Sequence, residues 1–176
     1  MKLPRDITHT LRLRDTGPPL ARFLSEAGGL GCKLGPLLVQ LPPSLAFDRD
    51  VAAAFFTLLR TQFPGLVACE PRHPTWFGAD GGALLARFRV AQVAADPACV
   101  PAAARPGGWP GLAYHRLHGS PETYRSAYEP ERLAAVARQL MEARGVGAAA
   151  WCIFDNTALG AAAGQALEVS RQLGCA

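Results

Sequence analysis

The sequence of 176 residues has no long hydrophobic run, because Arg, Glu, Gln or Pro interrupts every apolar stretch. A helix that crosses a membrane needs about 20 mostly apolar residues, so no membrane-spanning segment is expected. The first residues, Met1-Lys2-Leu3-Pro4-Arg5-Asp6, also lack the apolar core of a secretory signal. These absences predict a soluble, cytoplasmic protein without a membrane partner.

Clustered charge and paired cysteines are also lacking. The net charge of +4 is spread along the chain, whereas a nucleic-acid-binding surface is usually marked by clustered basic residues. The five cysteines, Cys32, Cys69, Cys99, Cys152 and Cys175, are widely spaced and include no C-x-x-C pair. Neither a disulfide framework nor a zinc knuckle is therefore expected.

Several motifs of known chemistry are missing as well. The sequence contains no H-E-x-x-H, no G-x-S-x-G, no P-loop and no G-x-G-x-x-G. Gly28-Gly29-Leu30-Gly31 follows a helical segment and not a strand, which argues against a phosphate loop. Glu70, His73, Asp96 and His118 could in principle hold a metal, but their spacing defines no site. We therefore predict no metal and no cofactor.

What the sequence does contain is an alternation of short apolar runs and longer helical patterns. Its length and its hydrophobic content of 49% suit one domain, residues 1–176. Strands are predicted over residues 37–41, 66–70, 89–95, 112–117 and 148–154, and helices over 50–60, 80–88, 130–144 and 159–173. Asp48 or Asp50 can cap the first of these helices and Asp80 the second, and residues 101–111 read as a loop. Such alternation predicts parallel strands covered by helices, either in a β/α barrel, which fits best, or in a doubly wound open sheet.

Polar residues stand where the predicted strands end. They are Gln40; Glu70, Arg72 and Trp76; Asp96; Arg116 and His118; and Asp155 and Asn156. Functional residues of α/β proteins gather at the carboxyl ends of parallel strands, and Tyr114, Arg116 and His118 alternate so that they share one face. We therefore expect Gln40, Glu70, Arg116, His118 and Asn156 to line one cavity. Structural roles remain open for the same residues: an ion pair for Glu70, packing for Trp76, a turn for His118, and backbone hydrogen bonds for Gln40 and Asn156.

Five segments together resemble one protein family. Lys2 to His9 resembles its K-x-x-R-x-I-T-H segment, and Leu34 to Pro43 its LGP-x-L-x-QLPP signature. Glu70 to Trp76 resembles E-x-R-H-x-S-W, Tyr114 to Gly119 resembles Y-x-R-x-HG, and Phe154 to Thr157 resembles F-N-N-T. The chain is similar throughout to the domain-of-unknown-function 72 (DUF72) family, the YecE-like proteins. The resemblance implies a TIM-type α/β barrel, and it implies no reaction, because the family has no settled activity.

Two departures from the family pattern stand out. Asp155 occupies a position where the family more commonly has Asn, which adds a possible charge. The family also has two further β/α units before the segment at Lys2, so the resemblance implies an incomplete barrel with about the last six of eight strands. Because missing strands would expose apolar surface and parallel edges, we expect Met1 to be an internal residue of a longer reading frame, with a fragment as the alternative.

The residues and the resemblance support two active functions. The first is an enzyme that binds a phosphorylated or otherwise anionic substrate through Lys2, Arg72 and Arg116, with Glu70 or His118 as the acid–base group and with Gln40, Trp76 and Asn156 as further binding residues. The second is a nucleic-acid-binding barrel that uses Arg72, Arg116 and Trp76. A non-functional truncated product is the remaining alternative. The modest net charge favours the anionic small molecule over nucleic acid.

Overall fold

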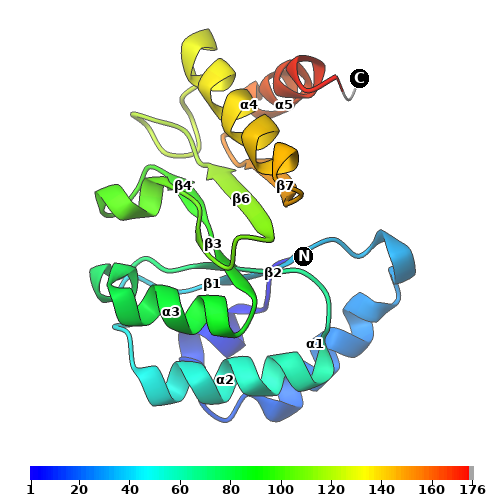
Figure 1. Ribbon diagram of the computed structural model, residues 1–176, viewed down its shortest axis with the longest axis vertical. Coiled ribbons are helices and arrows are strands. Elements are labelled where there is room, and N and C mark those ends of the chain that lie inside the picture. Colours follow the sequence, from blue (N-terminus) through cyan, green and yellow to red (C-terminus); the bar gives the residue numbers. More distant parts are fainter. Residues whose placement is uncertain (175–176) are drawn as a thin grey trace.

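The computed structural model describes residues 1–174, so Cys175 lies outside the described residues. It has a mixed α/β fold with parallel strands and helices, as the alternation of apolar patterns predicted, and its strands form two sheets. In Figure 1, helices α4 and α5 lie together at one end of the molecule and α1, α2 and α3 at the other. The strands run between these two groups of helices.

The first sheet has the order β1-β2-β3-β5. Strands β1 (Leu37–Gln40), β2 (Val67–Glu70) and β3 (Val90–Gln92) are parallel, and β5 (Gly107–Gly108) runs antiparallel to β3. Lys2 forms a parallel bridge to Leu38 on the other edge of the sheet. The predicted loop over residues 101–111 therefore contributes one short strand.

The second sheet has the order β4-β6-β7, and all of its pairs are parallel. Its strands are β4 (Ala94–Asp96), β6 (Leu112–Leu117) and β7 (Ala149–Phe154). The strand predicted over 89–95 is divided into β3 and β4 at Val93, whose N–H donates to the carbonyl oxygen of Cys69 at 2.8 Å. Residues 90–96 thus pair with β2 through their first half and with β6 through their second half, and the parallel strands follow one another in chain order.

The helices are α1 (Gly17–Gly28), α2 (Arg49–Gln62), α3 (Ala79–Arg87), α4 (Pro130–Gly145) and α5 (Ala161–Gln172). Asp48 caps α2, because its Oδ1 accepts from the backbone N–H groups of Asp50 and Val51 at 3.1 Å each. Asp80 does not cap α3. A 3₁₀ turn, Pro74–Phe77, brings the chain to Gly78 as the N-cap, which leaves Asp80 in the first turn, where a negative charge complements the helix dipole.

Shorter helical segments connect these elements. A π-helical segment spans Asp6–Thr10, and further 3₁₀ turns span Gly31–Lys33 and Pro101–Ala104. Among residues 1–174, no helix combines the length and the apolar character that crossing a membrane requires.

The core has three parts that follow the alternation of side chains along the strands. Residues such as Val39, Cys69 and Val90 point toward α1, α2 and α3. Their chain neighbours Leu38, Ala68 and Ala91 point to the opposite face, where they pack with Val93, Ala95, Leu112 and Tyr114 from the second sheet. A third part joins Leu117 to α4 and α5 through Leu133, Val136, Leu140 and Val169. One face of the first sheet therefore packs against one face of the second sheet. The helices pack on the opposite, outer faces of the two sheets.

Candidate functional site

The candidate site lies at the carboxyl ends of β2, β6 and β7. Glu70 is the last residue of β2, and Arg72 follows it by two positions. Arg116 lies near the end of β6 and His118 directly beyond it, while Asp155 follows β7. Because these strands are parallel, their ends meet, and the structure brings all five side chains into one cluster.

Glu70 is the centre of this cluster and is only 1% exposed. Its Oε2 accepts from Nη1 of Arg116 at 2.5 Å, and its Oε1 pairs with Arg72 and lies 3.2 Å from Nε2 of His118. Burial alone would raise the pKa of Glu70, but the hydrogen bond from His118 and the charges of Arg116 and Arg72 outweigh burial and lower the pKa to about 2. Glu70 is therefore a permanent anion with both oxygens occupied.

Arg116 joins two carboxylates. Its Nη1 donates to Glu70 and its Nη2 to Oδ2 of Asp155. Burial would lower the pKa of Arg116, but the neighbouring carboxylates, Glu70 first, raise it. Both terminal nitrogens are thus engaged, and the fork is not free for a ligand.

His118 is 2% exposed and lies between charged groups of both signs. Its Nε2 is 2.7 Å from Nη2 of Arg72, and its Nδ1 is 3.3 Å from Oδ2 of Asp155. Because a guanidinium only donates, the bond from Arg72 needs a proton-free Nε2, which places the ring proton on Nδ1 toward Asp155. The other tautomer donates from Nε2 to Glu70. Glu70 can thus accept a proton carried on Nε2, while Nδ1 lies near Asp155 without forming a hydrogen bond among the described residues.

A cavity of about 200 Å³, which we call the strand-end cavity, opens beside this cluster. Its lining residues are His9, Gln40, Leu41, Pro43, Arg72, Pro97, His118, Thr123 and Tyr124. Arg72 reaches it while its Nη1 donates to the carbonyl oxygen of Pro97 at 3.3 Å. The lining contains Arg, His, amide and hydroxyl groups and includes neither Asp nor Glu.

The N-terminal segment supplies one wall of the strand-end cavity. Nζ of Lys2 donates to Oε1 of Gln40 at 3.5 Å. His9 lines the cavity, and its Nδ1 lies 2.8 Å from Oγ1 of Thr8. Burial lowers the pKa of His9, and the positive charges of Arg5 and Lys2 lower it further.

The opposite wall comes from the loop after β6. Tyr124 is 54% exposed, and its ring meets the His118 ring edge-on with 6.0 Å between centroids. Its φ of +69° lies in the left-handed region, which a bulky residue rarely adopts. The backbone holds it there, because Tyr124 N–H donates to the carbonyl oxygen of His118 and Ala158 N–H donates to the carbonyl oxygen of Tyr124.

The structure brings some of the predicted residues together and keeps two apart. Gln40, Arg72 and His118 line the strand-end cavity, Lys2 contacts Gln40, and Glu70 and Arg116 lie behind it. Trp76 is buried and donates from its indole nitrogen to the carbonyl oxygen of Leu45 at 2.9 Å. Asn156 is also buried, and its Nδ2 donates to Ser126 O at 3.0 Å and to Gln165 Oε1 at 2.8 Å. Both side chains make structural hydrogen bonds and do not line the cavity.

Three polar residues that line the strand-end cavity were not among the sequence-based candidates. Thr123 and Tyr124 follow the strand-end motif at Tyr114 to Gly119, and His9 belongs to the segment at Lys2 that resembles the family. Asp155 was named as a polar residue after the last strand and as a departure from the family pattern, but no role was assigned to it. No local rule places these residues, since their position depends on loops that return to the strand ends.

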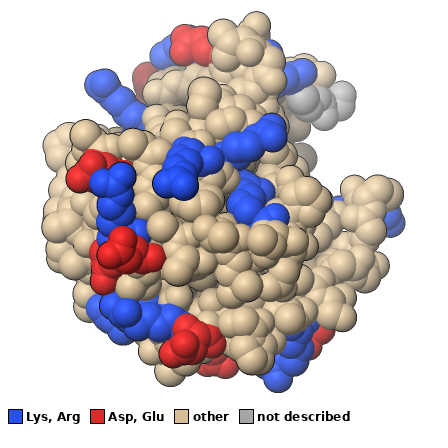
Figure 2. Space-filling model, turned by 60° about the horizontal axis from the view of Figure 1, so that its bottom comes forward, with Lys and Arg blue, Asp and Glu red and all other residues tan. Residues whose placement is uncertain are grey.

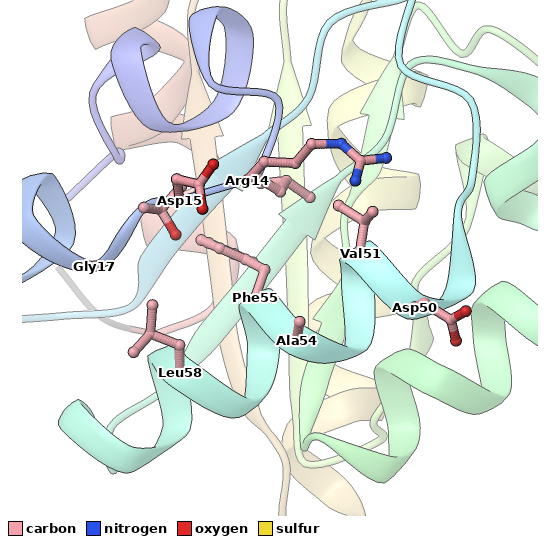
Figure 3. A pocket seen from close by; sticks show the side chains of 10 residues that line it. Arg14, Asp15, Gly17, Asp50, Val51, Ala54, Phe55 and Leu58 are labelled. Carbon is pink, nitrogen blue, oxygen red and sulfur yellow. The ribbon is translucent and has the colours of Figure 1, made fainter.

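A larger cavity of about 470 Å³ lies away from this cluster, between α2 and residues 13–17. Figure 3 shows Val51, Ala54, Phe55 and Leu58 of α2 facing the segment that carries Arg14 and Asp15. Arg14 is already paired with Asp48 at 3.1 Å. This cavity is mainly a groove between a helix and a loop. The cluster of guanidinium, imidazole and carboxylate groups lies at the strand ends instead, so we place the candidate site there.

No arrangement of metal ligands is present in the part of the chain that the structure describes, where no group of three or more His, Cys, Asp or Glu side chains could hold an ion. The carboxylates of Glu70 and Asp155 are taken by the guanidinium groups of Arg72 and Arg116.

Comparison with known proteins agrees with this fold and adds the family. The model of the family described as "protein of unknown function DUF72" matches residues 1–176, and the chain belongs to this family. A DUF72 family protein from Thermotoga maritima has a similar structure, with a TM-score of 0.81 and 25% identity over 98% of this chain and 72% of that chain.

Two structures of a DUF72 family protein from Enterococcus faecalis are also similar in fold. One has a TM-score of 0.75 with 18% identity over 93% of this chain and 68% of that chain. The other has a TM-score of 0.73 with 20% identity over 89% of this chain and 68% of that chain. No curated protein matches the chain.

Proposed function

We propose that this protein binds a small anionic molecule in the strand-end cavity, with Arg72 as its main contact. The observation that carries the proposal is the lining itself, which joins a guanidinium, two imidazoles and an amide without any carboxylate. Arg72 is held in place by Glu70 and His118 through its Nη2, while its Nη1, which donates one hydrogen to the carbonyl oxygen of Pro97, has a second hydrogen that can be donated to a phosphate or carboxylate oxygen in the cavity. A volume of about 200 Å³ suits a compact ligand rather than a large cofactor.

Within this proposal the charged residues have different roles. Glu70 is a positioning residue and not an acid–base group, because its pKa of about 2 keeps it ionised and its partners occupy both oxygens. Arg116 positions Glu70 and Asp155 in the same way. His118 lines the cavity and has a carboxylate near each ring nitrogen, so it is the candidate for proton transfer if the bound molecule reacts.

We also propose that the fold is the larger part of a β/α barrel. The parallel strands follow one another in chain order from Lys2 to β7, and the helices pack on the outer face. Trp151 of β7 lies against Gly35, just before β1, so that a Cβ atom on Gly35 would be 2.7 Å from the indole ring. The segment that leads into β1 and the last strand, β7, thus approach each other within the reach of one side chain.

The nucleic-acid alternative has less support. Trp76, the aromatic residue assigned to base stacking, is buried and hydrogen-bonded to Leu45. Figure 2 shows one face of the molecule, on which acidic and basic side chains lie near one another along one margin and a small basic group lies near the centre. A surface of one sign, which nucleic-acid backbones require, is not present on that face.

Titration with inorganic phosphate at low ionic strength tests the anion-binding proposal. We expect Arg72→Met to weaken binding about 10- to 100-fold and Arg72→Lys to weaken it less, because lysine keeps the charge and loses the planar fork. Arg138→Met, which removes an exposed arginine of α4, serves as the control for net charge. Melting curves of each variant separate lost binding from lost folding. Folded wild-type protein that binds neither phosphate, sulfate nor acetate would refute the proposal.

A further inference from the structure

The charges beside the strand-end cavity divide into a neutral inner group and a positive outer group. In the inner group, the carboxylates of Glu70 and Asp155 are matched by the guanidinium groups of Arg72 and Arg116. Two negative and two positive charges cancel there. A net charge at the cavity must therefore come from charged residues outside this inner group.

The N-terminal segment supplies that excess. Lys2 reaches Gln40, which lines the cavity, and Arg5 is close enough to His9, another lining residue, to lower its pKa together with Lys2. Burial and these two cations lower the pKa of His9, which favours its neutral form. Lys2 and Arg5 thus add two positive charges at one wall.

The loop after β6, which forms another wall of the cavity, adds no net charge. The loop between Gly119 and Tyr128 carries one acidic and one basic residue, Glu122 and Arg125, and both are exposed. Thr123 and Tyr124, which line the cavity, contribute hydroxyl groups.

Asp6, the acidic neighbour of Arg5, is exposed and is not among the groups that shift the pKa of His9. Among the charged groups that contact the lining residues or shift their pKa, Lys2 and Arg5 are thus unmatched, and a ligand with two negative charges would balance them.

We propose that the strand-end cavity selects doubly charged oxyanions of the phosphate monoester kind over singly charged carboxylates, and that Lys2, Arg5 and His9 make this distinction. The inference rests on the proposed function, because it needs an anion held by Arg72. It adds the class of ligand and three residues that act as a group. A dianion near His9 also favours a proton on this imidazole, which then becomes a further donor to the ligand.

Comparison of methyl phosphate with sulfate at two pH values tests the selection without any variant. A phosphate monoester loses its second proton near pH 6, so methyl phosphate is mostly a dianion at pH 7.5 and about nine-tenths a monoanion at pH 5, while sulfate stays a dianion. Titration of protein groups affects both ligands alike and cancels in the ratio of their affinities. We expect the affinity of methyl phosphate relative to sulfate to fall about tenfold between pH 7.5 and pH 5. An unchanged ratio would overturn the selection.

Variants then test which residues are responsible. At pH 7.5 and low ionic strength, we expect wild-type protein to bind methyl phosphate at least about tenfold more tightly than acetate. The double variant with Lys2→Met and Arg5→Met should lose most of this preference. The matched control, with Arg22→Met and Arg138→Met, removes two exposed arginines of α1 and α4 and should keep it. A control that loses the preference equally would overturn the assignment to Lys2 and Arg5.

The outcomes separate the two proposals. Equal binding of methyl phosphate and acetate, with both weakened by Arg72→Met, would leave anion binding in place and refute the selection for dianions. Absence of binding by every anion to folded wild-type protein would refute both. Because Lys2 and Arg5 are exposed side chains, we expect both double variants to keep the melting temperature of the wild type.

Discussion

Arg116 has a carboxylate on each of its terminal nitrogens, Glu70 on Nη1 and Asp155 on Nη2, and it is mostly buried. A buried ion pair contributes little when it is compared with an apolar replacement of the whole group, but removal of a single partner leaves buried charge without compensation. The side chain of Arg116 therefore matters for stability through the two acids that it neutralises.

We predict that Arg116→Met lowers the free energy of unfolding by about 3–5 kcal/mol, because Glu70 and Asp155 lose their shared partner. Arg116→Lys should cost less, since one ammonium group can face one of the carboxylates. Urea unfolding measures both, with Arg138→Met as a control that we expect within about 0.5 kcal/mol of wild type. Unchanged stability together with lost phosphate binding would instead make Arg116 a ligand-binding residue.

His115 points away from this cluster and is buried. Among the described residues, its Nε2 has no hydrogen-bond partner. Burial, together with the charge of Arg132, lowers the pKa of His115 to about 4. Above its usual pKa of 6.5, the imidazole is neutral in the folded and the unfolded chain, so His115 has no effect on stability there.

We predict that acidification from pH 6.5 to pH 4 destabilises the protein through His115. In this range the unfolded chain binds a proton at His115 that the folded protein does not bind. The free energy of unfolding therefore decreases as the pH decreases, by about 3 kcal/mol in total. Glu70 acts in a lower range, because its stabilising effect is lost only as pH falls from 4.5 toward 2. Urea unfolding at several pH values should show a shallower pH dependence between 6.5 and 4 for His115→Leu. Equal slopes for both proteins would contradict this role.

Helix α3 contains two adjacent glycines with different surroundings. A Cβ atom on Gly81 would overlap the carbonyl oxygen of Trp76, whereas one on Gly82 would meet nothing within 4 Å. The close approach at Gly81 lets the 3₁₀ turn Pro74–Phe77 pack against the start of the helix. Gly81 is therefore required by packing, and Gly82 is not.

We predict opposite effects for the two alanine substitutions. Gly82→Ala should stabilise the protein by about 0.5–1 kcal/mol, because alanine favours the helix over the unfolded chain. Gly81→Ala should destabilise it by about 1–3 kcal/mol, since the backbone of Trp76 has to move. Thermal melting of the two variants decides between them, and a stabilising Gly81→Ala would show that the contact with Trp76 relaxes freely.

The elements themselves were largely predictable from the sequence, because their apolar spacing is local. The strands that end at Gln40, Glu70, Leu117 and Phe154 lie where apolar runs predicted them, within one residue at each end. The division of residues 89–95 was not predictable, because it depends on the bond from Val93 to Cys69, a residue on another strand.

The clustering of charged residues at the strand ends was predictable, but their individual contacts were less so. Parallel strands bring their carboxyl ends together, which placed Glu70, Arg116 and His118 correctly in one cluster. The sequence could not show that Asp155 would occupy the second half of the Arg116 fork, because these residues are 39 positions apart. It also could not show that Trp76 and Asn156 turn inward, since a polar or aromatic residue after a strand can face either a cavity or a neighbouring loop.

At the scale of the whole molecule, the face shared by the two sheets connects the two groups of helices. Leu38 and Ala68 from the first sheet pack there with Leu112 and Tyr114 from the second. Residues 90–96 contribute a strand to each sheet, so the unfolding of one sheet removes a strand from the other. This continuity is what a barrel requires, and it implies that the chain unfolds as one cooperative unit.

We predict that a cavity in either outer layer destabilises both halves of the molecule equally. Leu59 of α2 and Leu140 of α4 are both buried, one in each layer. Leu59→Ala and Leu140→Ala should each lower the free energy of unfolding by about 2–5 kcal/mol. Native-state hydrogen exchange at the slowest amides of β2 and β6 measures the two halves separately, and both strands should lose the same protection in each variant. If Leu59→Ala lowered protection in β2 alone, the sheets would be independent folding units, and the proposal of one continuous barrel wall would fail.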